Sequence, residues 1–260
     1  MLEACFEEAK LLKNITETLK EMFTSVNFDC TSAGLSLQSM DSSHVALVDL
    51  MLRAEGFDSY RCDRSIPIGM SLASLTKILK CASPDDSVTL KAEDSGDTLN
   101  LVFESKNKER VSDYDMKLLA LDIDRLELPE IDPTAVVNLS STEFQKITRD
   151  LGAIGESITF DITKESIRFT VEGEVGTGNV ILKPTNAVDM RDNDCGTSLS
   201  VQKPLKLTLS SKYINMITKA SCFSPGITLH LAEGAPVLFE FKIADFGHLR
   251  FWLAPKIGEE

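Results

Sequence analysis

The chain repeats one supersecondary unit four times along its 260 residues, and this repeat limits the folds open to it. Each copy contains an amphipathic helix, a short polar break and two strands joined by a tight turn. The strands alternate apolar and polar residues, as at Val88–Leu90 and Ile158–Phe160. Because each copy combines one helix with a hairpin, the repeat predicts an α+β fold with helices packed on mainly antiparallel sheet. The helices are expected in the windows 11–22, 71–82, 141–152 and 211–222, and a serine heads the last three as a candidate N-cap.

An acidic stretch, Leu118–Pro133, interrupts the repeat between its second and third copies. It ends in prolines, yet it carries too many leucines and isoleucines for a plain solvated linker. We therefore expect two similar domains, 1–117 and 135–260, each with two helices, and an interdomain connecting loop at 118–134. Further strands are expected between the repeats, at Ser43–Leu52, Arg110–Leu118 and Gly178–Leu182.

Basic residues concentrate in the four helix windows of an otherwise acidic chain. The sequence has 27 Lys and Arg against 40 Asp and Glu, a formal net charge of −13, which taken alone argues against a nucleic-acid partner. The windows hold eight basic and four acidic residues, whereas the rest of the chain holds 19 basic and 36 acidic residues. The eight basic residues are Lys13, Lys20, Lys77, Lys80, Lys146, Arg149, Lys212 and Lys219.

The basic pair of each window falls on one side of its helix, within about 60° when successive residues are spaced by about 100°. Lysine and arginine commonly cover solvated helix faces, so one such helix carries little information. Four repeats of the placement favour a shared positive surface that follows a phosphate backbone without reading bases. The apolar residues on the opposite sides are Leu11, Ile15, Leu19 and Met22, then Leu72, Leu75 and Leu79, and then Phe144 and Leu151.

The sequence lacks the usual motifs of catalysis and metal binding, so we expect neither an enzyme nor a bound cofactor. It contains no nucleophile elbow, no glycine-rich phosphate loop and no HExxH. Two acidic clusters lack the glycine and the closing glutamate of a calcium loop. The six cysteines are scattered, which favours free thiols in a reducing compartment, and the N-terminus does not have the pattern of a signal peptide.

Six segments of the chain have a distinctive sequence: LQSMDSSHVALV (37–48), LRAEGFDSYRCDR (52–64), LTKILKCA (75–82), VSDYDMKL (111–118), KIADFGHL (242–249) and LAPKI (253–257). Together they closely resemble the eukaryotic proliferating cell nuclear antigen family of DNA sliding clamps, and the resemblance covers essentially the whole chain. The departures are local: an insertion near Met190–Gly196, a short acidic tail, Trp252 where tyrosine is common, and Asn14 and Ala153 at two positions that weaken candidate DNA contacts.

The resemblance implies a homotrimeric ring whose helices line the hole and whose sheets form the outer wall. Such a ring has no catalytic activity. It encircles double-stranded DNA in the nucleus and holds replicative DNA polymerase, the clamp loader, flap endonuclease and DNA ligase through short peptide motifs. Seven of the eight basic helix residues match DNA contacts of the family. Lys146 is included as a DNA contact because it lies on the same side of its helix as Arg149.

The resemblance also implies a peptide pocket and a subunit joint. In the pocket a short helical PIP-box peptide would dock, with His44 near its glutamine. The pocket residues would be Met40, His44, Val45, Leu47, Leu126, Leu128, Ile131, Pro236, Trp252, Ala254, Pro255 and Ile257. The joint residues would be Leu79, Cys81, Arg110, Ser112, Tyr114, Ile147, Leu151, Gly176, Gly178 and Val180, and Lys164 matches the main ubiquitin acceptor of the family.

Two other interpretations stay open at this point. The chain could be a subunit of a heterotrimeric checkpoint-type clamp, which requires subunits with non-identical edges. It could also be a monomeric acidic protein-interaction scaffold, which requires no ring. The solution mass separates a trimer from a monomer, because a trimer has three times the chain mass of 28.6 kDa.

Overall fold

The structure is a computed structural model that describes residues 1–94, 96–121, 126–129, 131–185 and 195–256. The chain divides into two compact units. Unit 1 contains residues 1–41, 48–126 and 243–249, and unit 2 contains 42–47, 127–242 and 250–260. Each unit thus includes one short segment from the part of the chain that forms mainly the other unit, whereas the domains expected from sequence are uninterrupted. The predicted domain boundaries stay a prediction.

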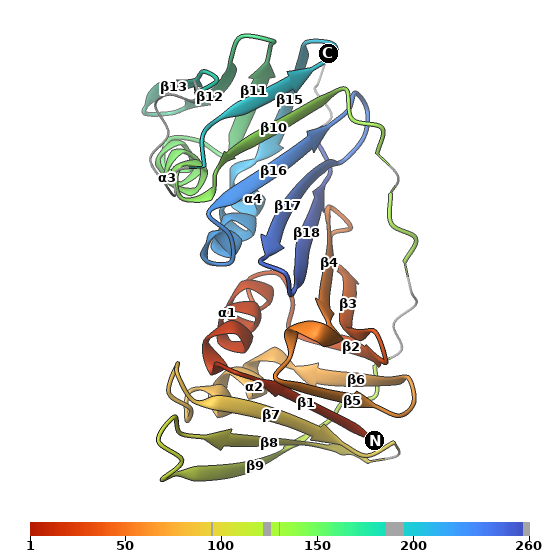
Figure 1. Cartoon of the computed structure of the whole chain (residues 1–260). Coiled ribbons are helices and arrows are strands. Elements are labelled where there is room, and N and C mark those ends of the chain that lie inside the picture. The colour runs from red at the N-terminus through yellow and green to blue at the C-terminus, as the bar shows by residue number, and fades with distance from the viewer. Residues whose placement is uncertain (95, 122–125, 130, 186–194, 257–260) are drawn as a thin grey trace. The chain divides into compact units, whose positions relative to one another are not determined.

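Unit 1 has two antiparallel sheets and two helices (Figure 1). One sheet has the order β5-β1-β7-β8-β9, and the other contains β6, β2, β3 and β4 in that order. The helices α1 and α2 pack against each other and against strands of these sheets. The elements are β1 (Leu2–Phe6), α1 (Ala9–Leu19), β2 (Ser25–Thr31), β3 (Gly34–Met40), β4 (Ala46–Arg53), β5 (Ser59–Cys62), β6 (Ile66–Ser71), α2 (Leu72–Leu79), β7 (Ser87–Ala92), β8 (Thr98–Glu104) and β9 (Val111–Lys117).

Unit 2 has the same plan, with α3 packed on strands of both of its sheets. One sheet has the order β13-β12-β11-β15, and the other contains β14, β10, β16, β17 and β18 in that order. The elements are β10 (Ala135–Ser140), α3 (Ser141–Gly152), β11 (Ser157–Ile162), β12 (Ile167–Gly173), β13 (Gly176–Leu182), β14 (Ser198–Val201), β15 (Leu205–Ser210), α4 (Ser211–Ile217), the 3-10 helix η3 (Thr218–Cys222), β16 (Gly226–Leu231), β17 (Val237–Ile243) and β18 (Gly247–Leu253).

The fourfold repeat and the α+β class are confirmed. Each predicted helix is followed by an antiparallel hairpin, as in β11–β12, where Ile158 pairs with Val171. The structure adds a strand directly before each helix, β1, β6, β10 or β15. These four strands are not among the predicted ones, although the alternation of Leu205, Leu207 and Leu209 in β15 is a strand signal.

Large apolar side chains fill the space between the helices and the sheets of each unit. In unit 2, Phe144 of α3 lies 5.8 Å from Phe169 and 6.2 Å from Phe239 between ring centroids. Phe160 and Phe169 pack edge to face at 4.9 Å. In unit 1, Leu12, Ile15 and Leu19 bury one side of α1. Leu12 rather than the predicted Leu11 faces this core, since Leu11 is only half-buried.

Several predicted element bounds were wrong for identifiable reasons. The strand expected from Ser43 begins at Ala46, because His44 has φ of 57° in a turn and a strand cannot run through a left-handed residue. The fourth helix is α-helical only to Ile217 and continues as η3, so Lys219 is not in the α-helical register assumed for it. The first and second helices end at Leu19 and Leu79, which leaves Lys20 and Lys80 as C-cap residues.

Two of the three predicted serine caps are present. Ser71 accepts a hydrogen bond from the Ser74 amide, and Ser140 accepts one from the Glu143 amide. Ser210 stands at the same place before α4, but its side chain makes no capping bond. The serine caps at α2 and α3 therefore help to define where these two helices begin.

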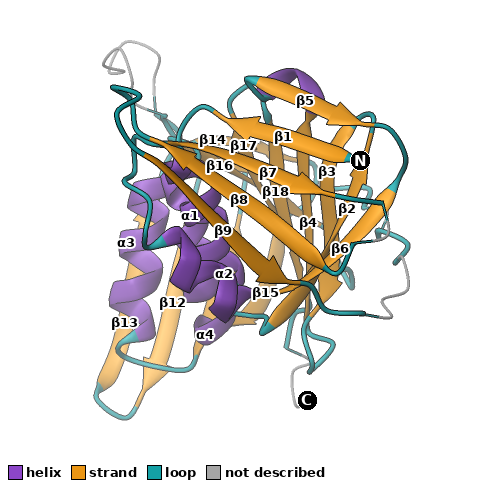
Figure 2. Cartoon of the chain, turned by 90° about the horizontal axis from the view of Figure 1, so that it is seen from below, coloured by secondary structure: helices purple, strands orange, loops and turns teal. Residues whose placement is uncertain are grey.

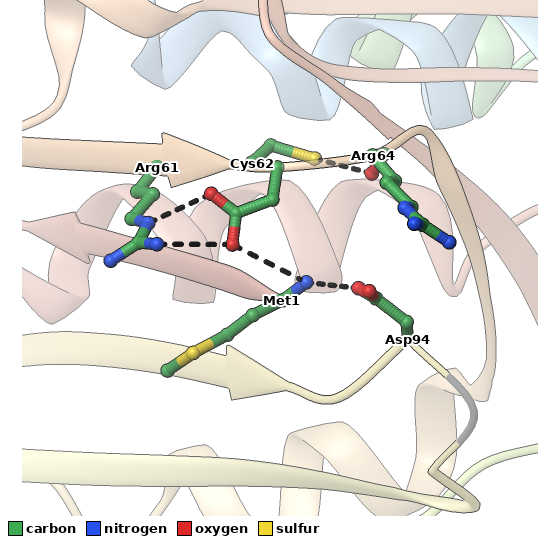
Figure 3. Close-up of polar contacts among 6 residues, drawn as sticks. Met1, Arg61, Cys62, Arg64 and Asp94 are labelled. Carbon is green, nitrogen blue, oxygen red and sulfur yellow. Dashed lines mark hydrogen bonds and ion pairs between the residues drawn. The ribbon is translucent and has the colours of Figure 1, made fainter.

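Charged groups hold the start of β1 in unit 1 (Figure 3). The Met1 ammonium contacts the Asp94 carboxylate and lies 3.8 Å from that of Asp63. The Arg61 guanidinium donates to Asp63 at 2.8 Å and, with the Met1 ammonium, holds the pKa of that carboxyl below its ordinary value. The Cys62 thiol donates to the Arg64 carbonyl at 2.9 Å. These contacts join β1, β5 and the end of β7.

Candidate nucleic-acid interface and protein contacts

In unit 1 the basic side chains lie on the sides of α1 and α2 that face away from the core. Lys20, Lys77 and Lys80 are exposed, and Lys13 is half-buried. The opposite sides bury Ile15 and Leu19 on α1 and the predicted Leu72, Leu75 and Leu79 on α2. Packing of the apolar side on the sheets therefore fixes the direction in which the lysines project.

Unit 2 repeats this arrangement with α3 and α4. Lys146 and Arg149 on α3 are exposed, while the predicted Phe144 and Leu151 are buried. Lys212 on α4 and Lys219 on η3 are also exposed. Within each unit, the sequence-predicted basic residues thus gather on one pair of packed helices.

Three of the eight basic side chains have a partner of their own. Lys20 forms an ion pair with Glu17, and Arg149 contacts Asp150 at 3.2 Å. The Nζ of Lys13 donates to the Ala82 carbonyl at 2.6 Å. The sequence analysis predicted none of these three contacts, although Glu17 and Lys20 have the usual i, i+3 spacing of helical ion pairs. The other five cations have no acidic partner within 4 Å among the described residues.

Each unit also has a sheet with an open edge. In unit 1, β9 is the last strand of its sheet (Figure 2). Val111 at the start of this strand is 63% exposed. In unit 2, β13 is the last strand of its sheet, and Ile181 is 46% exposed. An edge strand presents unpaired backbone N–H and C=O groups, and exposed apolar side chains on it mark a surface suited to pairing with another chain.

The predicted joint residues differ in how much surface they offer. Ser112, Tyr114, Gly178 and Val180 are half-exposed on the two edge strands, and Gly176 is exposed. Tyr114 packs on Phe103 at 5.5 Å, and its pKa is raised, chiefly by the neighbouring Cys81 thiol. Leu79, Ile147 and Leu151 are buried within their own units, so they have little surface for contact with a neighbouring subunit.

Arg110, a predicted joint residue, is engaged inside its own unit. Its guanidinium donates to the buried Asp86 carboxylate at 2.7 Å, and the Ser83 amide donates to the same oxygen at 2.8 Å. This pair connects the start of β9 to the turn before β7. No local pattern in the sequence predicts the pair, because the two residues lie 24 positions apart.

The predicted peptide-pocket residues are divided between the units. Met40 and Leu126 belong to unit 1, and the other described members belong to unit 2. In unit 2, the Ala254 amide donates to the Val45 carbonyl at 3.0 Å, which joins the end of β18 to the segment that carries His44. The side chain of Trp252 is 4% exposed, and its indole N–H has no hydrogen-bond partner among the described residues. Ile257 lies outside the described residues.

The predicted modification site lies in the turn between β11 and β12. Lys164 is exposed there, and the turn is closed by the Thr163 amide, which donates to the Ser166 carbonyl at 2.9 Å. The Thr163 hydroxyl also accepts from the Ser166 amide at 3.2 Å. A lysine on a short, hydrogen-bonded turn is accessible to a modifying protein.

In the part of the chain that the structure describes, no three His, Cys, Asp or Glu side chains lie close enough together to hold a metal ion. The six cysteines carry no disulfide in this part of the chain. No helix among the described residues is long and apolar enough to span a membrane.

Two family models match the chain. The model of the N-terminal domain of proliferating cell nuclear antigen matches residues 1–127, and the model of its C-terminal domain matches residues 127–256. Together the two matches include both pairs of basic helices and both open edges.

Proposed function

The chain belongs to the proliferating cell nuclear antigen family of sliding clamps, and from this premise we propose that three copies close into a ring around duplex DNA. The ring acts in the nucleus as a processivity factor for replicative DNA polymerase during DNA replication and repair. Clamps of this family are scaffolds without enzymatic activity, and we infer that this chain also catalyses no reaction.

The observation that carries the proposal is the repeated placement of basic side chains on the helices. Seven of the eight predicted basic residues are exposed, with at least one in each of the four repeats, while the chain as a whole has a net charge of −13. Twelve such helices in a trimer would line the hole with positive charge. Contacts of lysine and arginine with phosphates are independent of sequence, and this independence lets a ring slide.

The open edges support a closed ring of identical subunits. We infer that β9 of one subunit pairs with β13 of the next and that Tyr114 lies at this joint. Pairing would satisfy the backbone groups of both edges and cover Val111 and Ile181. A chain that carries both kinds of edge needs no second type of subunit, so these edges favour a homotrimer over a mixed ring.

We further propose that client proteins dock through short peptides in the predicted peptide pocket. The clamp loader, flap endonuclease and DNA ligase would bind there as the polymerase does, each with a short helical segment and apolar anchors. His44 and the main chain beside it would meet the peptide glutamine. Lys164 would be the site of ubiquitination.

A charge-reversal variant tests the proposed DNA interface. The variant replaces Lys20, Lys77, Arg149 and Lys219 with Glu, all four exposed on the helices. The matched control reverses four exposed basic residues outside the helices: Arg64, Lys106, Lys108 and Lys242. Both variants change the net charge equally.

Polymerase stimulation and retention on circular DNA should fall in the helix variant. The loss should be largest at low salt and should shrink as salt rises, because the parent loses more affinity per salt increment than a variant with fewer phosphate contacts. The control should behave like the parent, since its charges lie away from the helices. The helix variant should still sediment as a trimer. Equal stimulation by both variants across a salt series would contradict the proposed DNA interface.

A further inference from the structure

Lys13 differs from the other basic helix residues in what its ammonium group contacts. Its Nζ donates to the Ala82 carbonyl at 2.6 Å, across 69 positions of sequence. Ala82 is buried in the turn that follows α2. The bond therefore ties the side of α1 to the end of α2, and the charge lies where the last carbonyls of a helix concentrate negative potential.

Unit 2 has a hydrogen bond between its two helices in the corresponding place, and an uncharged residue donates it. Gln145 of α3 donates from Nε2 to the Thr218 carbonyl at 2.8 Å, and Thr218 is the buried C-cap residue of α4. In both units a side chain from the first helix thus satisfies a carbonyl just after the second helix. Because glutamine makes this contact without charge, the shared role is hydrogen bonding and not attraction to a phosphate.

The surroundings of Lys13 are poor for a phosphate. Lys13 and Lys80 line a small groove between α1 and α2 together with Thr16, Thr76, Glu17 and Leu79. The hydroxyls of Thr16 and Thr76 donate to the carbonyls of Leu12 and Leu72 at 2.8 and 2.7 Å, so neither is free to donate to an anion. The Glu17 carboxylate, which forms an ion pair with Lys20, also lines this groove and offers no hydrogen-bond donor to a phosphate.

We propose that Lys13 is a positioning residue that sets the packing of α1 on α2 and makes no phosphate contact. This inference rests on the proposed DNA interface, because it assigns one of the basic residues a different role there. Lys77 and Lys80, which are exposed, supply the contacts of unit 1 together with Lys20.

Two matched substitutions test the proposal: Lys13→Met and Lys80→Met, each of which removes one positive charge and keeps the aliphatic stem. For each trimer we would measure the thermal unfolding midpoint and the dependence of duplex-DNA affinity on salt. Lys13→Met should lower the midpoint by about 2–6 °C and leave the salt slope unchanged. Lys80→Met should leave the midpoint unchanged and reduce the slope by about 0.9 for each phosphate that it no longer neutralises.

A third variant, Gln145→Met, tests the hydrogen bond from Gln145 to the Thr218 carbonyl in unit 2. It should lower the midpoint as Lys13→Met does, with no change in salt slope. A reduced slope with an unchanged midpoint in Lys13→Met would overturn the proposal. If Lys80→Met and the parent show no salt-dependent binding at all, the proposed DNA interface fails, whereas the unfolding midpoints still decide the role of Lys13.

Discussion

Glu240 lies between the side chains of His230 and Arg250, which stand on neighbouring strands of unit 2. Its carboxylate lies 3.6 Å from His230 Nε2 on β16. It accepts a hydrogen bond from Arg250 Nε on β18 at 2.8 Å and forms an ion pair with Arg250 Nη2 at 2.7 Å. His230, and then Arg250, lower the pKa of Glu240 to about 2. A carboxyl whose pKa is lower in the folded than in the unfolded state stabilises the fold only while it is ionised.

The sign of this linkage gives a pH prediction. The stabilisation from Glu240 should be complete above its ordinary pKa of 4.5 and should be lost as the pH falls toward about 2. In urea denaturation, Glu240→Gln should be less stable than the parent at pH 7, and the difference should shrink steadily below pH of about 4.5. A difference that stays constant down to pH of about 2.5 would contradict the assignment.

At the residue scale, exposure could be predicted from sequence better than contacts could. The alternation of apolar and basic residues correctly predicted the exposure of seven of the eight basic side chains, whereas Lys13 is half-buried. The partners of Lys13 and Arg110 could not be found this way, since they lie 69 and 24 positions away and depend on how the elements pack. The burial of the Trp252 indole N–H, which has no partner among the residues described, depends on packing in the same way.

At the scale of elements, the helix caps should differ in energy. Ser140→Ala should lower the free energy of unfolding by about 1 kcal/mol, because it removes the side-chain acceptor for the Glu143 amide. Ser210→Ala should cost much less, since Ser210 makes no capping bond. Denaturant titrations of the two variants check this, and equal losses would show that the cap geometry is not what stabilises α3.

The edge strand β9 offers a second test at this scale. Tyr114→Ala should shift the protein from trimer to monomer at micromolar concentration, because it removes the largest side chain of the proposed joint on that strand. Sedimentation measures the mass, and far-ultraviolet circular dichroism should stay nearly unchanged, since Tyr114 is only half-buried in its own unit. A trimer of undiminished stability would place the joint elsewhere.

Element types could be predicted from sequence, whereas some element ends could not. The periodic spacing of apolar residues and the positions of turn residues identified the four helices and their hairpins, because both signals are local in the sequence. The end of α4 depends on the change to 3-10 geometry at Thr218, whose hydroxyl bonds to the Asn215 carbonyl at 3.2 Å. The start of β4 depends on the left-handed turn at His44, where the sequence has no glycine to indicate it.

At the scale of the whole molecule, the proposed peptide pocket would connect the clamp to its client proteins. Leu126→Ala combined with Leu128→Ala should weaken binding of a PIP-box peptide by about 2–4 kcal/mol, or about 30- to 1000-fold, by removing apolar contact area. Titration calorimetry measures the affinity. Leu119→Ala, at an exposed leucine of the segment that precedes these residues, is the matched control and should bind as the parent does.

The trimer mass should not change in this double variant, because neither leucine is among the predicted joint residues. Unchanged peptide affinity would remove the connector from the pocket, and loss of folding would show that these leucines act in the core. The sequence alone could propose this pocket only through its resemblance to a family, because its members come from four separate segments and share no local pattern.

The two open edges differ in chemistry as well as in position along the chain. β9 carries Tyr114 between Asp113 and Asp115, whereas β13 carries Gly176, Gly178 and Val180. Unlike edges can join only head to tail, so no two-fold axis can relate neighbouring subunits. Every subunit of the proposed ring then has the same orientation, and the ring has a front and a back with different surfaces. Clients that bind equivalent sites on the three subunits therefore all lie on the same side of the ring.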